Sequence, residues 1–421
     1  MHHRVRRFSS FVVLLLLIGT LPAEGQYGFH FGQNKVQYEK FDWQILETEH
    51  FEIYYYPEME ELGEYAGHFA EEAYADLQHR FDFSLTRKVP LIIYSSARHF
   101  RQTNVRPGFI PPGVGGFFEF LKGRVVIPSN GDIHRFRRVV RHELVHVFTF
   151  AKMARVVKDH RKPPGRYLPL WFTEGLAEHW SGEPDYQYET IMRDAVISNV
   201  LVPLDDIHRI AGSYLMYKQG ESICRFISQR YGDDMLLRLI DNSWKDKDFR
   251  RVMEMTLHED FMTISEQWEE WVRKEYYPIL DDAQLPSLTA SAIATEGYNA
   301  KPVYYTHKDG SRSVYAIGNK TGYTNVYEIP VDSTYRPIGE PEVLIEGGRT
   351  KEFESFHPLE SRLDISCNGK LAFVTKSGGN DVVHVYDLEA DRIINSYRFP
   401  SLVTIYSPSW SPDNEQLSFS S

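Results

Sequence analysis

The sequence contains only two cysteines, Cys224 and Cys367, among its 421 residues. They lie far apart, in regions of different composition, so a disulfide framework is excluded. A structural zinc site with four cysteines, or with a close pair of cysteines and two histidines, is excluded for the same reason. Cys224 lies on the apolar side of a helical pattern, which predicts a buried side chain.

Long hydrophobic runs are missing after residue 25, so we expect no transmembrane segment in the mature chain. The one apolar run, FVVLLLLIGTL, follows the basic segment MHHRVRR and is short for a bilayer span. Ala23 and Gly25 after it resemble a cleavage site, which predicts a secretory signal peptide over residues 1–25; a short membrane anchor is the alternative. No cysteine follows the run, so a bacterial lipoprotein anchor is excluded. We expect an exported protein, periplasmic or extracellular, of a bacterial cell envelope.

An excess of basic residues is also lacking, since the formal net charge is −11. This charge argues against nucleic acid as a partner. One stretch interrupts the acidic balance and is expected to form a solvated rim around a helix, with attraction of acidic substrate groups as the alternative: Arg135, Arg137, Arg138 and Arg141, then Arg155, Lys158, Arg161, Lys162 and Arg166.

The first part of the chain combines strand and helix patterns. It begins with a strand pair, a helix, a buried strand and a hairpin turning at Lys122-Gly123, and it is almost wholly helical from Ile133 to about Tyr277. This order predicts an α+β domain over residues 26–282, with an α/β beginning and a helical end.

A different pattern follows a linker of small and polar residues at 283–297. NVYEIPVDS at 325–333 is echoed by HVYDLEADR at 384–392, and SCNGKLAFVTKSGG at 366–379 by SPDNEQLSFSS at 411–421. Repeats of several strands at a spacing of about 45 residues or somewhat more are typical of propeller blades. We therefore expect an incomplete all-β propeller over residues 298–421, which a longer natural chain would complete.

The stretch VVRHELVHVF at 139–148 has the pattern H-E-x-x-H. At 3.6 residues per turn, His142 and His146 lie on one helix face and can bind one ion. Glu143 lies beside that face, where it can reach a metal-bound water as a general base. The flanking residues are so apolar that a plain polar helix surface is a poor explanation.

A third ligand has to come from elsewhere in the chain. A metzincin would have glycine and histidine where this sequence has Thr149 and Lys152, so that class is excluded. The later segment LPLWFTEGLAEHW at 168–180 offers glutamates and His179. His179 lies five residues after Glu174 and would face away from it.

With Trp171, Glu174, Gly175 and Glu178 in these positions, the chain resembles the gluzincin metallopeptidases, the group that includes thermolysin and the zinc aminopeptidases. The resemblance implies that Glu174 is the third zinc ligand. It also implies that Glu178 is an outer carboxylate that orients a ligating histidine. Three protein ligands leave zinc a fourth position for water, as in catalytic sites.

The resemblance extends to two further segments. Tyr217 and Gly220 match a Tyr-x-x-Gly motif whose tyrosine binds the oxyanion, although Tyr217 and Tyr214 could also simply pack. Gly116 and Glu119 lie where gluzincins place an edge strand for extended substrate, and Glu119 is the counterpart of the glutamate that reads a free N-terminus. Beyond residue 297 the chain looks like a TolB-like propeller, most clearly in SWSPDNEQLSF.

Together these features predict an exported zinc metallopeptidase that acts on peptide or protein substrates. Its propeller would restrict access or bind a protein partner. The alternative is a non-catalytic binding or scaffold protein of the cell envelope that acts through the propeller.

Overall fold

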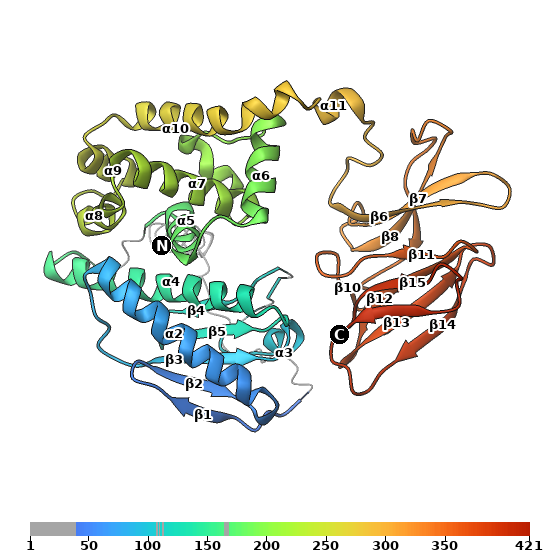
Figure 1. The fold of residues 1–421 in the computed structure, drawn as a ribbon, viewed down its shortest axis with the longest axis horizontal. Helices are drawn as coiled ribbons and strands as arrows, with labels where there is room; N and C mark the ends of the chain where they lie inside the picture. The colour runs from blue at the N-terminus through green and yellow to red at the C-terminus, as the bar shows by residue number, and fades with distance from the viewer. Residues whose placement is uncertain (1–38, 107, 109, 112, 164–167) are drawn as a thin grey trace, which may run out of the picture.

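The computed structural model describes residues 39–106, 108, 110–111, 113–163 and 168–421. Residues 1–38, and with them the predicted signal peptide, lie outside this description. Two parts lie side by side in Figure 1, a mixed N-terminal part coloured blue to yellow and a C-terminal β part coloured orange to red. The fold is α+β, with several antiparallel sheets in the C-terminal part.

A five-stranded sheet forms the base of the N-terminal part, with strand order β1-β2-β3-β5-β4. Its central strands β2, β3 and β5 are parallel, while β1 and β4 are antiparallel and lie at the edges. The β4–β5 hairpin turns at Gly123, whose φ of 71° lies in the region that favours glycine. The strands are β1 (Gln44–Glu47), β2 (Phe51–Tyr55), β3 (Val89–Tyr94), β4 (Phe117–Glu119) and β5 (Arg124–Pro128).

Helices cover this sheet and then form a layer of their own. Helices α2 and α4 pack on the sheet and on each other, and α5 and α7 lie beyond α4 (Figure 1). The helices are α2 (Glu60–Phe81), α3 (Ala97–Arg101), α4 (Ile133–Asp159), α5 (Leu170–Ser181), α6 (Tyr186–Ile197), α7 (Tyr214–Tyr231), α8 (Asp234–Asn242), α9 (Phe249–Leu257), α10 (Phe261–Tyr276) and α11 (Pro286–Thr289). Short 3₁₀ turns are η1 (Pro57–Met59), η2 (Leu204–Ile210) and η3 (Tyr277–Asp281). The predicted strand pair, helix, hairpin and helical region are all present.

The C-terminal part consists of antiparallel sheets. Four consecutive strands form the first sheet, in the order β6-β7-β8-β9, and the second has the order β10-β12-β13-β14 with β11 also paired to β12. A further hairpin, β15-β16, packs on the second sheet. The strands are β6 (Asn299–Thr306), β7 (Arg312–Gly318), β8 (Asn325–Val331), β9 (Glu342–Ile345), β10 (Ser355–Phe356), β11 (Asp364–Ile365), β12 (Lys370–Ser377), β13 (Asn380–Asp387), β14 (Arg392–Arg398), β15 (Tyr406–Trp410) and β16 (Leu417–Ser420).

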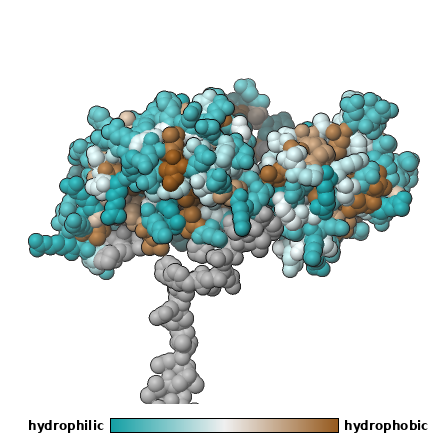
Figure 2. Space-filling model, turned by 90° about the horizontal axis from the view of Figure 1, so that it is seen from below, coloured by the Kyte–Doolittle hydropathy of each residue, from teal (hydrophilic) through white to brown (hydrophobic). Residues whose placement is uncertain are grey.

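The two parts have separate apolar cores. One cluster of buried side chains runs from Phe51 to Tyr276, and the clusters of the C-terminal part begin at Tyr305. On the face seen in Figure 2, hydrophilic residues prevail and apolar ones form separate patches. Within the described residues, no helix combines the length and apolar character that crossing a membrane requires.

Two glycines allow α5 and α7 to cross in backbone contact. A Cβ on Gly175 would lie 2.2 Å from the carbonyl carbon of Gly220, and one on Gly220 would lie 2.3 Å from the carbonyl oxygen of Trp171. Neither position has room for a methyl group, because backbone atoms cannot move aside as a side chain can. This crossing brings the glutamates of α5 next to the polar residues of α7.

We predict that Gly220→Ala lowers the free energy of unfolding by about 3 kcal/mol, because the added methyl group forces the two helices apart. Chemical denaturation of the purified protein measures this change. Gly339→Ala is the matched control, since its Cβ would meet nothing within 4 Å. Equal stability of the two variants would contradict the tight crossing.

Candidate active site

Helix α4 carries the H-E-x-x-H residues across the middle of the N-terminal part. Asp132 caps the helix, since its carboxylate accepts hydrogen bonds from the backbone N–H groups of His134 and Arg135 at 3.0 and 3.1 Å. His142 and His146 follow on one face, and their Nε2 atoms lie 3.2 Å apart. The two imidazoles therefore point at the same position, as the spacing predicted.

Helix α5 brings a carboxylate to the same position. Oε2 of Glu174 lies 3.5 Å from Nε2 of His142 and 3.2 Å from Nε2 of His146. These three residues form a group that could hold a metal ion, and each is partly buried. His179, the rival ligand, points elsewhere, because its Nε2 lies 3.5 Å from Oδ1 of Asp233.

The donor set fits a zinc ion. Zinc binds imidazole nitrogen and carboxylate oxygen at about 2.0–2.2 Å, so neighbouring ligands of a tetrahedral ion lie about 3.3–3.5 Å apart. The three distances here, 3.2, 3.2 and 3.5 Å, correspond to that spacing without any rearrangement. Burial alone would raise the pKa of Glu174, but His146 and His142 outweigh it and hold that pKa far below its ordinary value.

Glu143 is buried beside these ligands and lacks a partner of its own. Its side chain is 4 % exposed, and no described residue exchanges a hydrogen bond with its Oε2 atom. Burial raises the pKa of Glu143 to about 8, against the opposing effect of His146. A buried carboxyl group without a partner is costly, which points to a function that requires it.

Gly116 lies directly against Glu143, just before β4. A Cβ on Gly116 would lie 2.9 Å from Oε1 of Glu143, so glycine lets the chain pass close to the carboxyl group. Glu119, for which a substrate role is predicted, makes contacts within its own hairpin. Its carboxylate accepts hydrogen bonds from the backbone N–H groups of Leu121 and Lys122 and pairs with Arg124 at 2.9 Å. It holds the hairpin turn and is not free to read a substrate amine.

The two tyrosines of α7, Tyr214 and Tyr217, have different surroundings. The phenol of Tyr217 interacts with the carboxylate of Glu174; burial raises the pKa of Tyr217, and the negative charges of Glu174 and Glu143 raise it further. The hydroxyl of Tyr214 instead donates to the carbonyl oxygen of Gly113 at 3.3 Å, and Tyr214 is exposed. Tyr217 is therefore the tyrosine that the fold brings to the site.

Glu178 lies one turn after Glu174 and faces the other nitrogen of the first histidine. Its Oε1 is 3.7 Å from Nδ1 of His142, and its Oε2 accepts from Lys218 at 2.9 Å and Arg138 at 3.2 Å. Burial opposes ionisation, but His142, Lys218 and Arg138 lower the pKa of Glu178 to about 2. A permanently charged carboxylate at this place can orient the imidazole.

Sequence reasoning missed the charged group behind Glu178. Lys218 is 4 % exposed and also pairs with Glu221, which is fully buried, at 3.2 Å. The signal was available, because Lys218 and Glu221 are three apart on an apolar helix and buried charges need partners. Arg138 and Arg141 are partly buried in pairs with Glu178 and Asp76, so the predicted solvated rim is wrong for these two arginines.

Residues 69–274 match the model of the Peptidase MA superfamily. The match spans α4, α5 and α7 as well as Gly116 and Glu119, so it includes every residue placed at the site. No curated protein matched the chain. The match supports a peptidase, and the His-His-Glu group agrees with the metal dependence typical of that superfamily.

We predict that Glu174→Ala strongly reduces the zinc content per chain, because only the two imidazoles remain. Metal analysis after dialysis measures the stoichiometry. His179→Ala is the control, since its imidazole faces Asp233, and it should retain the parent zinc content. Unchanged zinc in Glu174→Ala would remove Glu174 from the ligand set.

Proposed function

We propose that this protein is an exported zinc metallopeptidase of the gluzincin type. The observation that carries the proposal is the convergence of His142 Nε2, His146 Nε2 and Glu174 Oε2 within 3.5 Å. Beside them lies the buried carboxyl group of Glu143, whose Oε2 has no hydrogen-bond partner among the described residues. A peptidase of this kind binds peptide or protein substrates.

His142, His146 and Glu174 would hold the ion, with Glu178 orienting the imidazole of His142. When bound, zinc would supply Lewis acidity toward water and the substrate carbonyl. Its positive charge would also favour the ionised form of Glu143, whose pKa is raised to about 8, mainly by burial. Glu143 can then accept the proton of the attacking water and later return it to the leaving amine.

The remaining groups would orient the substrate and stabilise developing charge. The Tyr217 phenol keeps its proton at neutral pH, since burial and the nearby carboxylates raise its pKa, so it can donate to the carbonyl oxygen as negative charge develops there. Edge strand β4 pairs only with β5 among the described strands. An extended peptide can add to its other edge, with Gly116 giving access to Glu143.

We further propose the division predicted from sequence: a signal peptide at 1–25, a peptidase domain at 26–282, a linker at 283–297 and propeller-like repeats at 298–421. The separate apolar cores and the four-stranded meander β6–β9 support this division. Export to the periplasm or cell exterior rests on the sequence of residues 1–25.

The alternative is a non-catalytic scaffold that keeps the peptidase fold for its shape. Such a protein has no need of Glu143, because a buried carboxyl group without a partner costs stability and adds no ligand. The presence of this group favours the enzyme.

We predict that Glu143→Gln abolishes peptide hydrolysis while zinc stays bound, because the base is lost and the ligands are intact. Hydrolysis of a casein or peptide-library substrate and metal analysis of the same sample are the two measurements. Activity within about tenfold of the parent would contradict the proposed base. Absence of activity in the parent protein with zinc bound would favour the scaffold.

We predict that Tyr217→Phe lowers kcat by about 10²-fold with little change in KM, as expected when one oxyanion donor is lost. Steady-state kinetics on the best peptide substrate separate the two constants. A larger loss of kcat in Tyr214→Phe than in Tyr217→Phe would show that Tyr214, one turn earlier on α7, is the oxyanion donor.

A further inference from the structure

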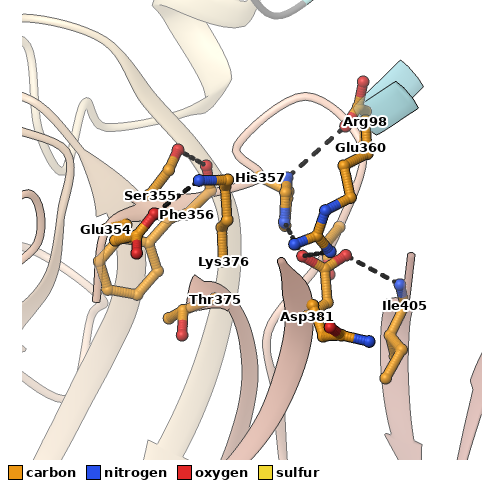
Figure 3. Close-up of polar contacts among 12 residues, drawn as sticks. Arg98, Glu354, Ser355, Phe356, His357, Glu360, Thr375, Lys376, Asp381 and Ile405 are labelled. Atoms are coloured by element: carbon orange, nitrogen blue, oxygen red, sulfur yellow. Dashed lines mark hydrogen bonds and ion pairs between the residues drawn. The ribbon is translucent and has the colours of Figure 1, made fainter. Parts of the chain in front are cut away.

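The C-terminal part is docked onto the N-terminal part by a buried arginine. Arg98 of α3 is 7 % exposed, and its guanidinium donates to the carbonyl oxygens of Val403 at 2.5 Å and Gly378 at 2.9 Å. Its Nη1 atom also lies 3.7 Å from Oδ1 of Asp381. Figure 3 draws these two side chains facing each other. Peptide oxygens and a buried carboxylate on the C-terminal part thus bind one cation of the N-terminal part.

On the C-terminal part, hydrogen bonds hold the carboxylate that contacts Arg98 in place. Asp381 is 1 % exposed and interacts with Nε2 of His357 at 3.0 Å and with the backbone N–H of Ile405 at 3.0 Å (Figure 3). Glu360 pairs with Arg101, one turn after Arg98, at 3.2 Å. The turn His357–Glu360 is therefore fixed at both ends against α3.

This turn reaches the chain segment that leads into the active site. A Cβ on Gly113 would lie 3.0 Å from Cδ1 of Leu359, and Gly113 has a φ of 90°, which favours glycine. Leu359 is 38 % exposed. Beside it, the hydroxyl of Tyr298, also partly exposed, donates to the carbonyl oxygen of Pro358 at 3.3 Å.

Gly113 is three residues before Gly116, which touches Glu143. An extended chain spans about 3.3 Å per residue, so this segment covers at most about 10 Å. A peptide substrate could add to the free edge of β4 and continue along residues 113–116. It would then contact Leu359 about three residues from the peptide bond that is cleaved next to Glu143.

We propose that Leu359 and Tyr298 of the C-terminal part form the far wall of the substrate cleft, and that they bind an apolar side chain of the peptide about three residues from the cleaved bond. The cleft is then a composite of both parts, and Arg98 is a positioning residue that holds the wall in place. This inference rests on the proposed peptidase function.

The test uses the full chain and a series of peptides with one cleaved bond, lengthened by one leucine at a time on either side. Leu359→Ala should raise KM about fivefold, with kcat unchanged, for those peptides that are long enough on one side to reach the wall. Peptides shorter than that should be cleaved as by the parent. A merely structural effect of the substitution would change all lengths alike.

Ile338→Ala is the matched control, because Ile338 is an aliphatic residue of the C-terminal part that is 68 % exposed. Arg98→Ala should reproduce the length-dependent rise in KM if it folds, but Leu359→Ala decides the question, because its side chain is at the surface. An unchanged KM, or one raised equally for every length, would overturn the inference. If the parent cleaves none of the peptides, the proposed function fails and the inference fails with it.

Discussion

The active site depends on the close crossing of α5 and α7, which only the absence of side chains at Gly175 and Gly220 allows. Because the helix backbones touch, Glu174 and Glu178 project toward α4 on one side of the crossing, while Tyr217 and Lys218 project from α7 beside them. A wider crossing would shift α5 relative to α4 or to α7, and metal coordination tolerates only a few tenths of an ångström of change in the position of Glu174 at His142 and His146. The two glycines therefore act on the chemistry through packing alone.

The crossing of α5 and α7 also brings buried carboxyl groups together with the positive charges that neutralise them. Glu178 and Glu221 are buried carboxyl groups, and Lys218 and Arg138 supply the cations that pair with them. Each of these groups would be costly to bury alone, but together they form a connected set in which Glu178 stays ionised. His142, a candidate metal ligand, thus has an ionised carboxylate behind it, which Arg138 of α4 and Lys218 of α7 hold in place.

Local patterns predicted much of this molecule, whereas contacts between distant segments were harder to infer. The spacing of apolar residues predicted α2 over Glu60–Phe81, and the i, i+4 histidines predicted their own convergence. The sequence could not show that Glu119 would be used by its own hairpin turn, since a short-range carboxylate–backbone contact competes with any substrate role. Nor could it show that Arg98 would be buried against peptide oxygens some 300 residues away in the chain.

Glu143 is the residue for which stability and function conflict most clearly. Among the described residues its Oε2 has no hydrogen-bond partner, and burial raises its pKa to about 8, so folding places a carboxyl group where it is least stable when charged. Val140, Leu144 and Val147, which neighbour Glu143 on α4, are buried and apolar, so an apolar side chain at this position would avoid the cost of burying a charge. A bound cation removes the conflict, because its charge compensates the desolvation that the protein alone does not. The cost of burying Glu143 is thus consistent with a site that is complete only when the three neighbouring ligands hold their ion.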